Sequence, residues 1–134
     1  MKLKWKAAVA AMLAAGGCAS AVEPEEVSQE VAERLAEFEA TGETRSCIGV
    51  TQIRTIDALD ESRFLVRAGG AYYLNEVSGR CNGADRAFNR LQYTTSIGQL
   101  CRNEIIRIVD NSNGFTVGSC SLGDFQELEE IATE

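Results

Sequence analysis

Cysteine is the residue type whose positions in this chain point most directly to chemistry. Cys18 follows Gly16 and Gly17 at the end of a short apolar stretch, and three lysines stand at the start of that stretch. A basic start, an apolar stretch and small residues before a cysteine are typical of a bacterial lipoprotein signal. We therefore predict a signal peptide over residues 1–17 and a diacylglycerol- and palmitate-modified Cys18 that anchors the mature protein to a membrane.

An ordinary secretion signal is the alternative to this lipoprotein signal. Ala19-Ser20-Ala21 fits the A-x-A cleavage pattern, so cutting after Ala21 would leave a soluble periplasmic or secreted protein. A membrane-spanning helix is not expected, because the apolar stretch is far shorter than the roughly 20 residues that a bilayer core requires. Both alternatives place the rest of the chain in the bacterial cell envelope, facing the periplasm, or outside the cell.

The body of the chain holds four more cysteines, which are Cys47, Cys81, Cys101 and Cys120. An even number in a short exported domain predicts two disulfides. Three pairings are open from the sequence alone. We favour a bond joining the first and last predicted strands, Cys47–Cys120, and a bond closing the middle loop, Cys81–Cys101. With no C-x-x-C pair and no histidine in the chain, we predict no metal site and no other cofactor.

The remaining residue types argue against catalysis. Without histidine there is no Ser-His-Asp or Cys-His arrangement, and every lysine lies in the leader. Carboxylates cluster at Asp57, Asp60 and Glu61 in one turn, with Glu76 and Asp85 near the central loop, but acids in turns commonly bond to nearby backbone amides. We therefore predict no catalytic residue and a protein that is not an enzyme.

Charge limits the partners. A chain beginning at Cys18 has ten arginines against twenty acidic residues, which argues against nucleic acid or an anionic lipid surface as a partner. Most arginines are expected on the surface. Three of them, Arg80, Arg86 and Arg90, lie within the loop predicted over residues 78–90, and together they would form a site for an anionic ligand if they converge beside it.

Periodicity predicts one helix and then strands. An apolar stripe with spacings of four and three residues indicates an amphipathic helix over 24–40, followed by a stop at Gly42. Beyond it, apolar runs and turn signals predict six short strands, at 47–56, 63–68, 71–77, 91–95, 104–110 and 115–120. Gly69-Gly70 marks the clearest hairpin, and Asn111 to Gly114 marks a second.

These elements predict a mainly β (α+β) fold. We expect a small antiparallel meander or barrel of about six strands, preceded by one amphipathic helix and held by two disulfides. The predicted organisation is a signal peptide at 1–17, an acidic tether and helix at 18–42, the disulfide-bonded β domain at 43–127 and an acidic tail at 128–134.

Several segments of the body resemble one known family. They include Cys47-Ile48, Ile53-Arg54, the stretches 60–66 and 70–75, residues 78–81, 85–88, 98–101 and 104–106, and the stretch 118–125. Over most of residues 46–126, the four body cysteines included, the chain is similar to a family of small uncharacterised proteobacterial envelope proteins. The resemblance implies a domain of unknown function, commonly with a secretion or lipoprotein signal, and no established active site.

The sequence thus favours an envelope lipoprotein that acts as a non-enzymatic binding or accessory module. Its expected partners are the membrane, through the lipid anchor, and an envelope protein or a small ligand. Alternatively, the chain is a soluble periplasmic protein that acts as a small carboxylate-dependent hydrolase or as an enzyme inhibitor.

Overall fold

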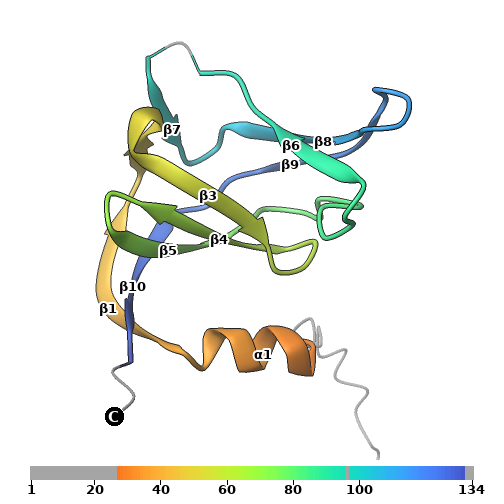
Figure 1. Cartoon of the computed structure of the whole chain (residues 1–134). Coiled ribbons are helices and arrows are strands. Elements are labelled where there is room, and N and C mark those ends of the chain that lie inside the picture. The colour runs from red at the N-terminus through yellow and green to blue at the C-terminus, as the bar shows by residue number, and fades with distance from the viewer. Residues whose placement is uncertain (1–26, 96, 132–134) are drawn as a thin grey trace, which may run out of the picture.

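The structure, a computed structural model, describes residues 27–95 and 97–131 (Figure 1). Cys18 and the predicted leader lie outside the described residues. One α-helix, α1 (Gln29–Leu35), precedes the strands of the described part, and a 3-10 turn spans Val50–Gln52. The strands are β1 (Phe38–Arg45), β2 (Cys47–Gly49), β3 (Ile53–Ala58), β4 (Arg63–Ala68), β5 (Ala71–Glu76), β6 (Asn89–Gln92), β7 (Gln99–Cys101), β8 (Ile105–Asp110), β9 (Thr116–Ser121) and β10 (Phe125–Glu130).

The helix is shorter than the sequence pattern predicted. Ser28 caps its start by accepting a hydrogen bond from the Val31 N–H, and it ends at Leu35. The prediction of a helix up to residue 40 was wrong, because the chain from Phe38 onward forms β1 and pairs with β10. Pairing with a strand from the other end of the chain therefore overrides the helical spacing of the apolar residues.

All strand pairs are antiparallel, which confirms the predicted mainly β fold. One sheet has five strands in the order β1-β10-β5-β4-β3, a second has the order β6-β8-β9, and β2 pairs with β7. The described residues form ten strands where about six were predicted. The strands β1, β7 and β10 were not expected, and the strand predicted at 47–56 is divided by the 3-10 turn into β2 and β3. Both β1 and β10 run across the boundaries predicted at 42/43 and 127/128, and β10 lies between β1 and β5.

The hairpin predicted at Gly69-Gly70 is confirmed. The two glycines have φ values of 58° and 80°, and they connect β4 to β5 in register from Ala68↔Ala71 to Arg63↔Glu76. A two-residue turn of this kind requires positive φ at both positions, which glycine adopts without steric cost. The second predicted hairpin is also present, as β8 and β9.

The main core lies between the five-stranded sheet and the two smaller sheets (Figure 1). Its largest fully buried side chains are Phe64, Val66, Leu100, Ile106, Ile108 and Phe125. Leu65 points to the opposite face of β4, where it packs with Phe38 and Leu128 and with Leu35 of the helix. The five-stranded sheet is therefore covered on both faces. As expected from strand alternation, Tyr73 enters the main core while Tyr72 stays partly exposed on the helix side.

Two disulfides form, as predicted, but the favoured pairing was wrong. Cys47 bonds to Cys101, and Cys81 bonds to Cys120. The pairing of β2 with β7 places Cys47 directly opposite Cys101. Because β7 was not predicted, Cys101 was assigned to the middle loop and its strand partner was missed.

Asn75 joins β5 to the turn between β9 and β10. Its side chain is fully buried, donates a hydrogen bond from Nδ2 to the Gly123 carbonyl and accepts one at Oδ1 from the Gly123 N–H, both at 2.8 Å. A Cβ atom at Gly123 would overlap the Glu76 carbonyl oxygen, so only glycine allows this close approach. One side chain thus satisfies both backbone groups of Gly123.

We predict that Asn75→Ala lowers the free energy of unfolding by about 2–4 kcal/mol, because two backbone groups lose their partners in a partly buried place. Urea denaturation followed by far-UV circular dichroism measures this change. Asn111→Ala is the matched control, since the exposed Asn111 side chain only accepts a bond from Arg90, and it should cost less than about 1 kcal/mol. Equal costs for the two variants would contradict the assigned role of Asn75.

Candidate binding site

The β5–β6 loop (residues 77–88) is fixed to the rest of the fold from its inner side. Cys81 is fully buried and bonded to Cys120 of β9, and its N–H donates a hydrogen bond to the Glu61 carbonyl at 2.8 Å. Gly83 and Ala84 are also buried, whereas Asn82 and residues 85–88 are exposed. The loop therefore contributes to the core on one side and presents side chains on the other.

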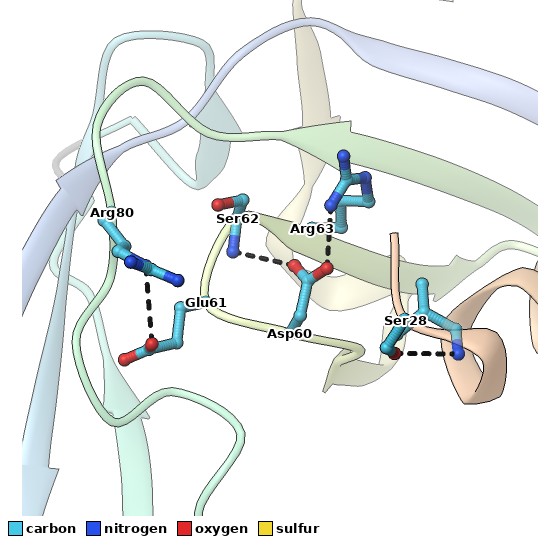
Figure 2. Close-up of polar contacts among 7 residues, drawn as sticks. Ser28, Asp60, Glu61, Ser62, Arg63 and Arg80 are labelled. Carbon is cyan, nitrogen blue, oxygen red and sulfur yellow. Dashed lines mark hydrogen bonds and ion pairs between the residues drawn. The ribbon is translucent and has the colours of Figure 1, made fainter. Parts of the chain in front are cut away.

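Glu61 holds this loop to the β3–β4 turn. One carboxylate oxygen accepts a hydrogen bond from the Gly83 N–H at 2.6 Å, and the other lies 3.4 Å from Nε of Arg80 (Figure 2). In the same turn, Asp60 accepts bonds from the Ser62 N–H at 2.8 Å and from Arg63 at 2.7 Å. The acids of this turn thus bond to backbone amides and arginines and do not face one another as a catalytic pair.

Gly83 lies where the loop passes closest to β6 and β9. Its φ is 79°, and a Cβ atom there would come within 2.7 Å of Nδ2 of Asn89. The same Asn89 amide donates a hydrogen bond to the Gly83 carbonyl at 2.9 Å. On β9, a Cβ atom at Gly118 would overlap the Asn82 backbone. Glycine at both positions allows the loop and the strands to approach this closely.

A cavity of about 550 Å³ opens where this loop meets β6, β8 and β9. It is lined by Glu61, Asn82, Gly83, Arg86, Phe88, Asn89, Asp110 and Val117. Three large apolar residues at or near its edge are exposed to solvent: Phe88 to 81 %, Phe115 to 71 % and Val117 to 44 %. We call these three residues the apolar rim. Exposed apolar side chains grouped around a polar hollow are typical of interaction sites.

The backbone places the two aromatic residues of the apolar rim beside the end of β8. The Phe88 carbonyl accepts a hydrogen bond from the Asn111 N–H at 3.0 Å, and the Phe115 carbonyl accepts one from the Asp110 N–H at 2.9 Å. Phe115 therefore lies beside Asp110, the last residue of β8, and Phe88 lies beside Asn111, which follows it. The sequence analysis missed both residues. Each lies in or next to a turn, where no alternating strand pattern indicates which way a side chain points.

The pKa of Asp110 is displaced by local hydrogen bonds. The Ser112 hydroxyl and the Ser112 N–H donate hydrogen bonds to its carboxylate, at 2.5 and 2.7 Å, and they lower its pKa below the ordinary value of 3.8. A carboxylate held in its ionised form is a poor proton donor near neutral pH. Asp110 therefore supplies the cavity with a fixed negative charge and hydrogen-bond acceptors.

The three arginines predicted to bind an anion do not converge. Arg86 lines the cavity, and Arg80 lies beside it through its pair with Glu61. Arg90 follows Asn89 on β6, and because successive side chains of a strand point to opposite faces, it lies on the other side of the sheet. There it donates a hydrogen bond to the Asn111 side chain at 2.7 Å. Of the described residues that line the cavity, Arg86 is the one with a cationic side chain.

Among residues 27–95 and 97–131, no group of three or more cysteine, aspartate or glutamate side chains is arranged to hold a metal ion. Within those ranges, no helix has the length and apolar character needed to cross a membrane.

The fold and the two disulfides show which class of protein this chain represents. It is a small, mainly β domain whose two disulfides indicate an oxidising, extracytoplasmic compartment. The chain belongs to a family of unknown function, DUF6491, whose model matches residues 1–129. Neither a curated protein nor a solved structure matches the chain significantly.

We predict that Asp110 titrates below 3.8 in a carbon-13 NMR titration of the side-chain carboxyls, and that Ser112→Ala raises its midpoint. Since the folded pKa is the lower one, these hydrogen bonds stabilise the fold above the unfolded pKa, and that contribution is lost as pH falls through the folded pKa. Ser119→Ala, an exposed serine on β9, is the control and should leave the midpoint in place. An unchanged midpoint in Ser112→Ala would show that the serine is not the cause.

Proposed function

We propose that the protein is a non-enzymatic binding module of the bacterial envelope, lipidated at Cys18, and that it binds a polypeptide at the cavity beside the apolar rim. The observation that carries this proposal is the exposure of Phe88 and Phe115 next to a cavity whose loop is fixed by a buried disulfide. Aromatic residues are enriched at protein interfaces, and a site fixed before binding loses less conformational entropy on association.

The lining of the cavity supports a polypeptide as the partner. Glu61 and Asp110 contribute negative charge, Arg86 contributes positive charge, and Asn82 and Asn89 add carboxamide groups. Such a surface offers donors and acceptors to peptide groups, while the apolar rim offers contacts to apolar side chains. Nucleic acid or an anionic lipid would instead require a predominantly cationic surface.

The chemistry of the acids favours binding over catalysis. The chain has no histidine, Asp110 is held ionised, and both oxygens of Glu61 already have partners in Gly83 and Arg80. A carboxylate-dependent hydrolase needs one acid whose pKa is raised so that it can donate a proton. Asp110, whose pKa is lowered, does not meet this requirement.

The lipid anchor rests on the sequence before the described residues. Residues 1–17 have the pattern of a lipoprotein signal that ends at Cys18, and the family model matches the chain from residue 1. The oxidising compartment indicated by the disulfides agrees with export.

We expect wild-type protein made in a bacterial host to sediment with membranes and to carry an acylated N-terminal Cys18, as measured by mass spectrometry of the intact chain. Cys18→Ala should abolish acylation, whereas Ser20→Ala should leave both acylation and sedimentation unchanged. A wild-type chain that begins at Val22 without acyl groups would reject the lipid anchor and support cleavage after Ala21.

The binding site is tested by placing a photo-crosslinking amino acid at position 88 in intact cells. We expect a discrete adduct with a polypeptide, and we expect Phe115→Ser to weaken it strongly, because the exposed Phe115 lies beside Asp110 of the cavity lining. Glu39, an exposed residue of β1, is the control position for the probe. The proposal fails if position 88 gives no adduct, if the Glu39 probe gives the same adduct, or if Phe115→Ser leaves the adduct unchanged.

A further inference from the structure

The two disulfides lie in different surroundings. Cys81 and Cys120 are 0 % and 6 % exposed and belong to the main core. Cys47 and Cys101 are both partly exposed, and they join β2 and β7, a pair of three-residue strands separate from the larger sheets. Attack on a disulfide by an external thiolate requires access to sulfur, so the two bridges should differ in reactivity.

The register of β2 and β7 explains how the accessible bridge is held. Val50 donates its N–H to the Gly98 carbonyl at 2.9 Å, and Arg102 donates its N–H to the Ser46 carbonyl at 2.7 Å. Since hydrogen-bonded and non-hydrogen-bonded pairs alternate in an antiparallel ladder, the cysteine pair occupies a non-hydrogen-bonded position. Its Cα atoms are accordingly close, at 4.0 Å.

This position means that the bridge can open without breaking a ladder hydrogen bond. The Cys101 N–H is bonded instead to the Glu104 carboxylate, at 2.5 Å. The intervening rung is held by Ile48 and Leu100, which are 3 % and 1 % exposed and pack in the main core. Within the described residues, the pair formed by β2 and β7 exchanges no ladder hydrogen bond with the two larger sheets.

We propose that Cys47–Cys101 is a thiol–disulfide exchange site whose reaction partner is an extracytoplasmic dithiol. A thiolate of the dithiol attacks one sulfur of the bridge, forming a mixed disulfide, while the other cysteine leaves as a thiolate and takes up a proton. The second thiol of the dithiol, after losing its proton, then attacks the mixed disulfide and releases the first cysteine, which is protonated in turn. Overall, the protein bridge gains two electrons and two protons and becomes two thiols, and the dithiol is oxidised to a disulfide.

Reduction at this site is a local event. The bond joins residues 54 positions apart in the sequence, but the strands that it joins are anchored separately by their core residues. The reduced chain keeps its main core, including Ile48 and Leu100, and loosens where β2 and β7 carry Cys47 and Cys101. This exchange site shares no residue with the cavity near Phe88, so it stands or falls independently of the proposed binding function.

Timed alkylation tests the proposal on the oxidised mature protein without denaturant. Dithiothreitol is added, free thiols are trapped with iodoacetamide, and peptide mass spectrometry locates the alkylated cysteines. We expect Cys47 and Cys101 to be modified about tenfold faster, or more, than Cys81 and Cys120. In the control Cys47→Ser/Cys101→Ser, the fast phase should disappear while the slow phase remains. Equal rates in the wild type, or faster opening of Cys81–Cys120, would overturn the proposal.

Hydrogen exchange of the wild-type protein after the fast phase supplies a second readout that needs no variant. We expect faster amide exchange confined to β2, β7 and the adjoining 3-10 turn, with β4, β5, β8 and β9 unchanged. Faster exchange throughout the sheets would show that the Cys47–Cys101 disulfide stabilises the whole fold, and it would reject a local exchange site.

Discussion

The buried bond between Cys81 and Cys120 is the constraint on which the candidate site depends. It draws the β5–β6 loop into the main core beneath β9, where Glu61 and Asn89 then bind Gly83 from two sides. With its inner residues held in the core, the loop presents Arg86 and Phe88 outward from a fixed backbone. A polar loop of this length would otherwise lose much conformational entropy on binding. The bridge that stabilises the domain therefore also prepares its surface for recognition.

The parts of the fold that were predicted correctly are those set by neighbouring residues. Gly69-Gly70 determines the β4–β5 hairpin because positive φ at both positions is a property of the turn itself. In contrast, β1 is a strand because it pairs with β10, some ninety residues away. Its first residue, Phe38, continues an apolar spacing that also suits a helix, so the sequence pattern did not predict a strand there. The strand β7 has three residues and needs β2 to exist. Long-range pairing of this kind leaves little trace in a single sequence.

The same limit explains what was missed at the site. Sequence reasoning located the loop and two of the arginines beside the cavity, because turn residues and charges are visible in composition. The exposure of Phe88 and Phe115 was not visible, since an aromatic residue near a turn packs inward or outward according to strand register. The separation of Arg90 from Arg86 follows from strand alternation, which becomes known only once β6 is placed. The disulfide pairing depended likewise on which strands meet.

Pairing of β1 with β10 brings acidic residues from the two ends of the described chain onto one edge of the five-stranded sheet. Glu39 of β1 lies directly opposite Glu129 of β10, a like-charge pair that costs stability but discourages another chain from adding to the exposed edge strand. The helix α1 adds Glu30 and Glu33 nearby in sequence. If Cys18 carries the lipid that we propose, the ten residue steps to Ser28 span at most about 35 Å, and the domain would stay near the membrane. Repulsion between these acids and an anionic lipid surface would then turn the end bearing α1 and β1 away from the headgroups as far as the tether allows. The three-stranded sheet lies across the five-stranded sheet from α1 (Figure 1), so in a lipidated protein the two ends of the domain would experience different electrostatic forces.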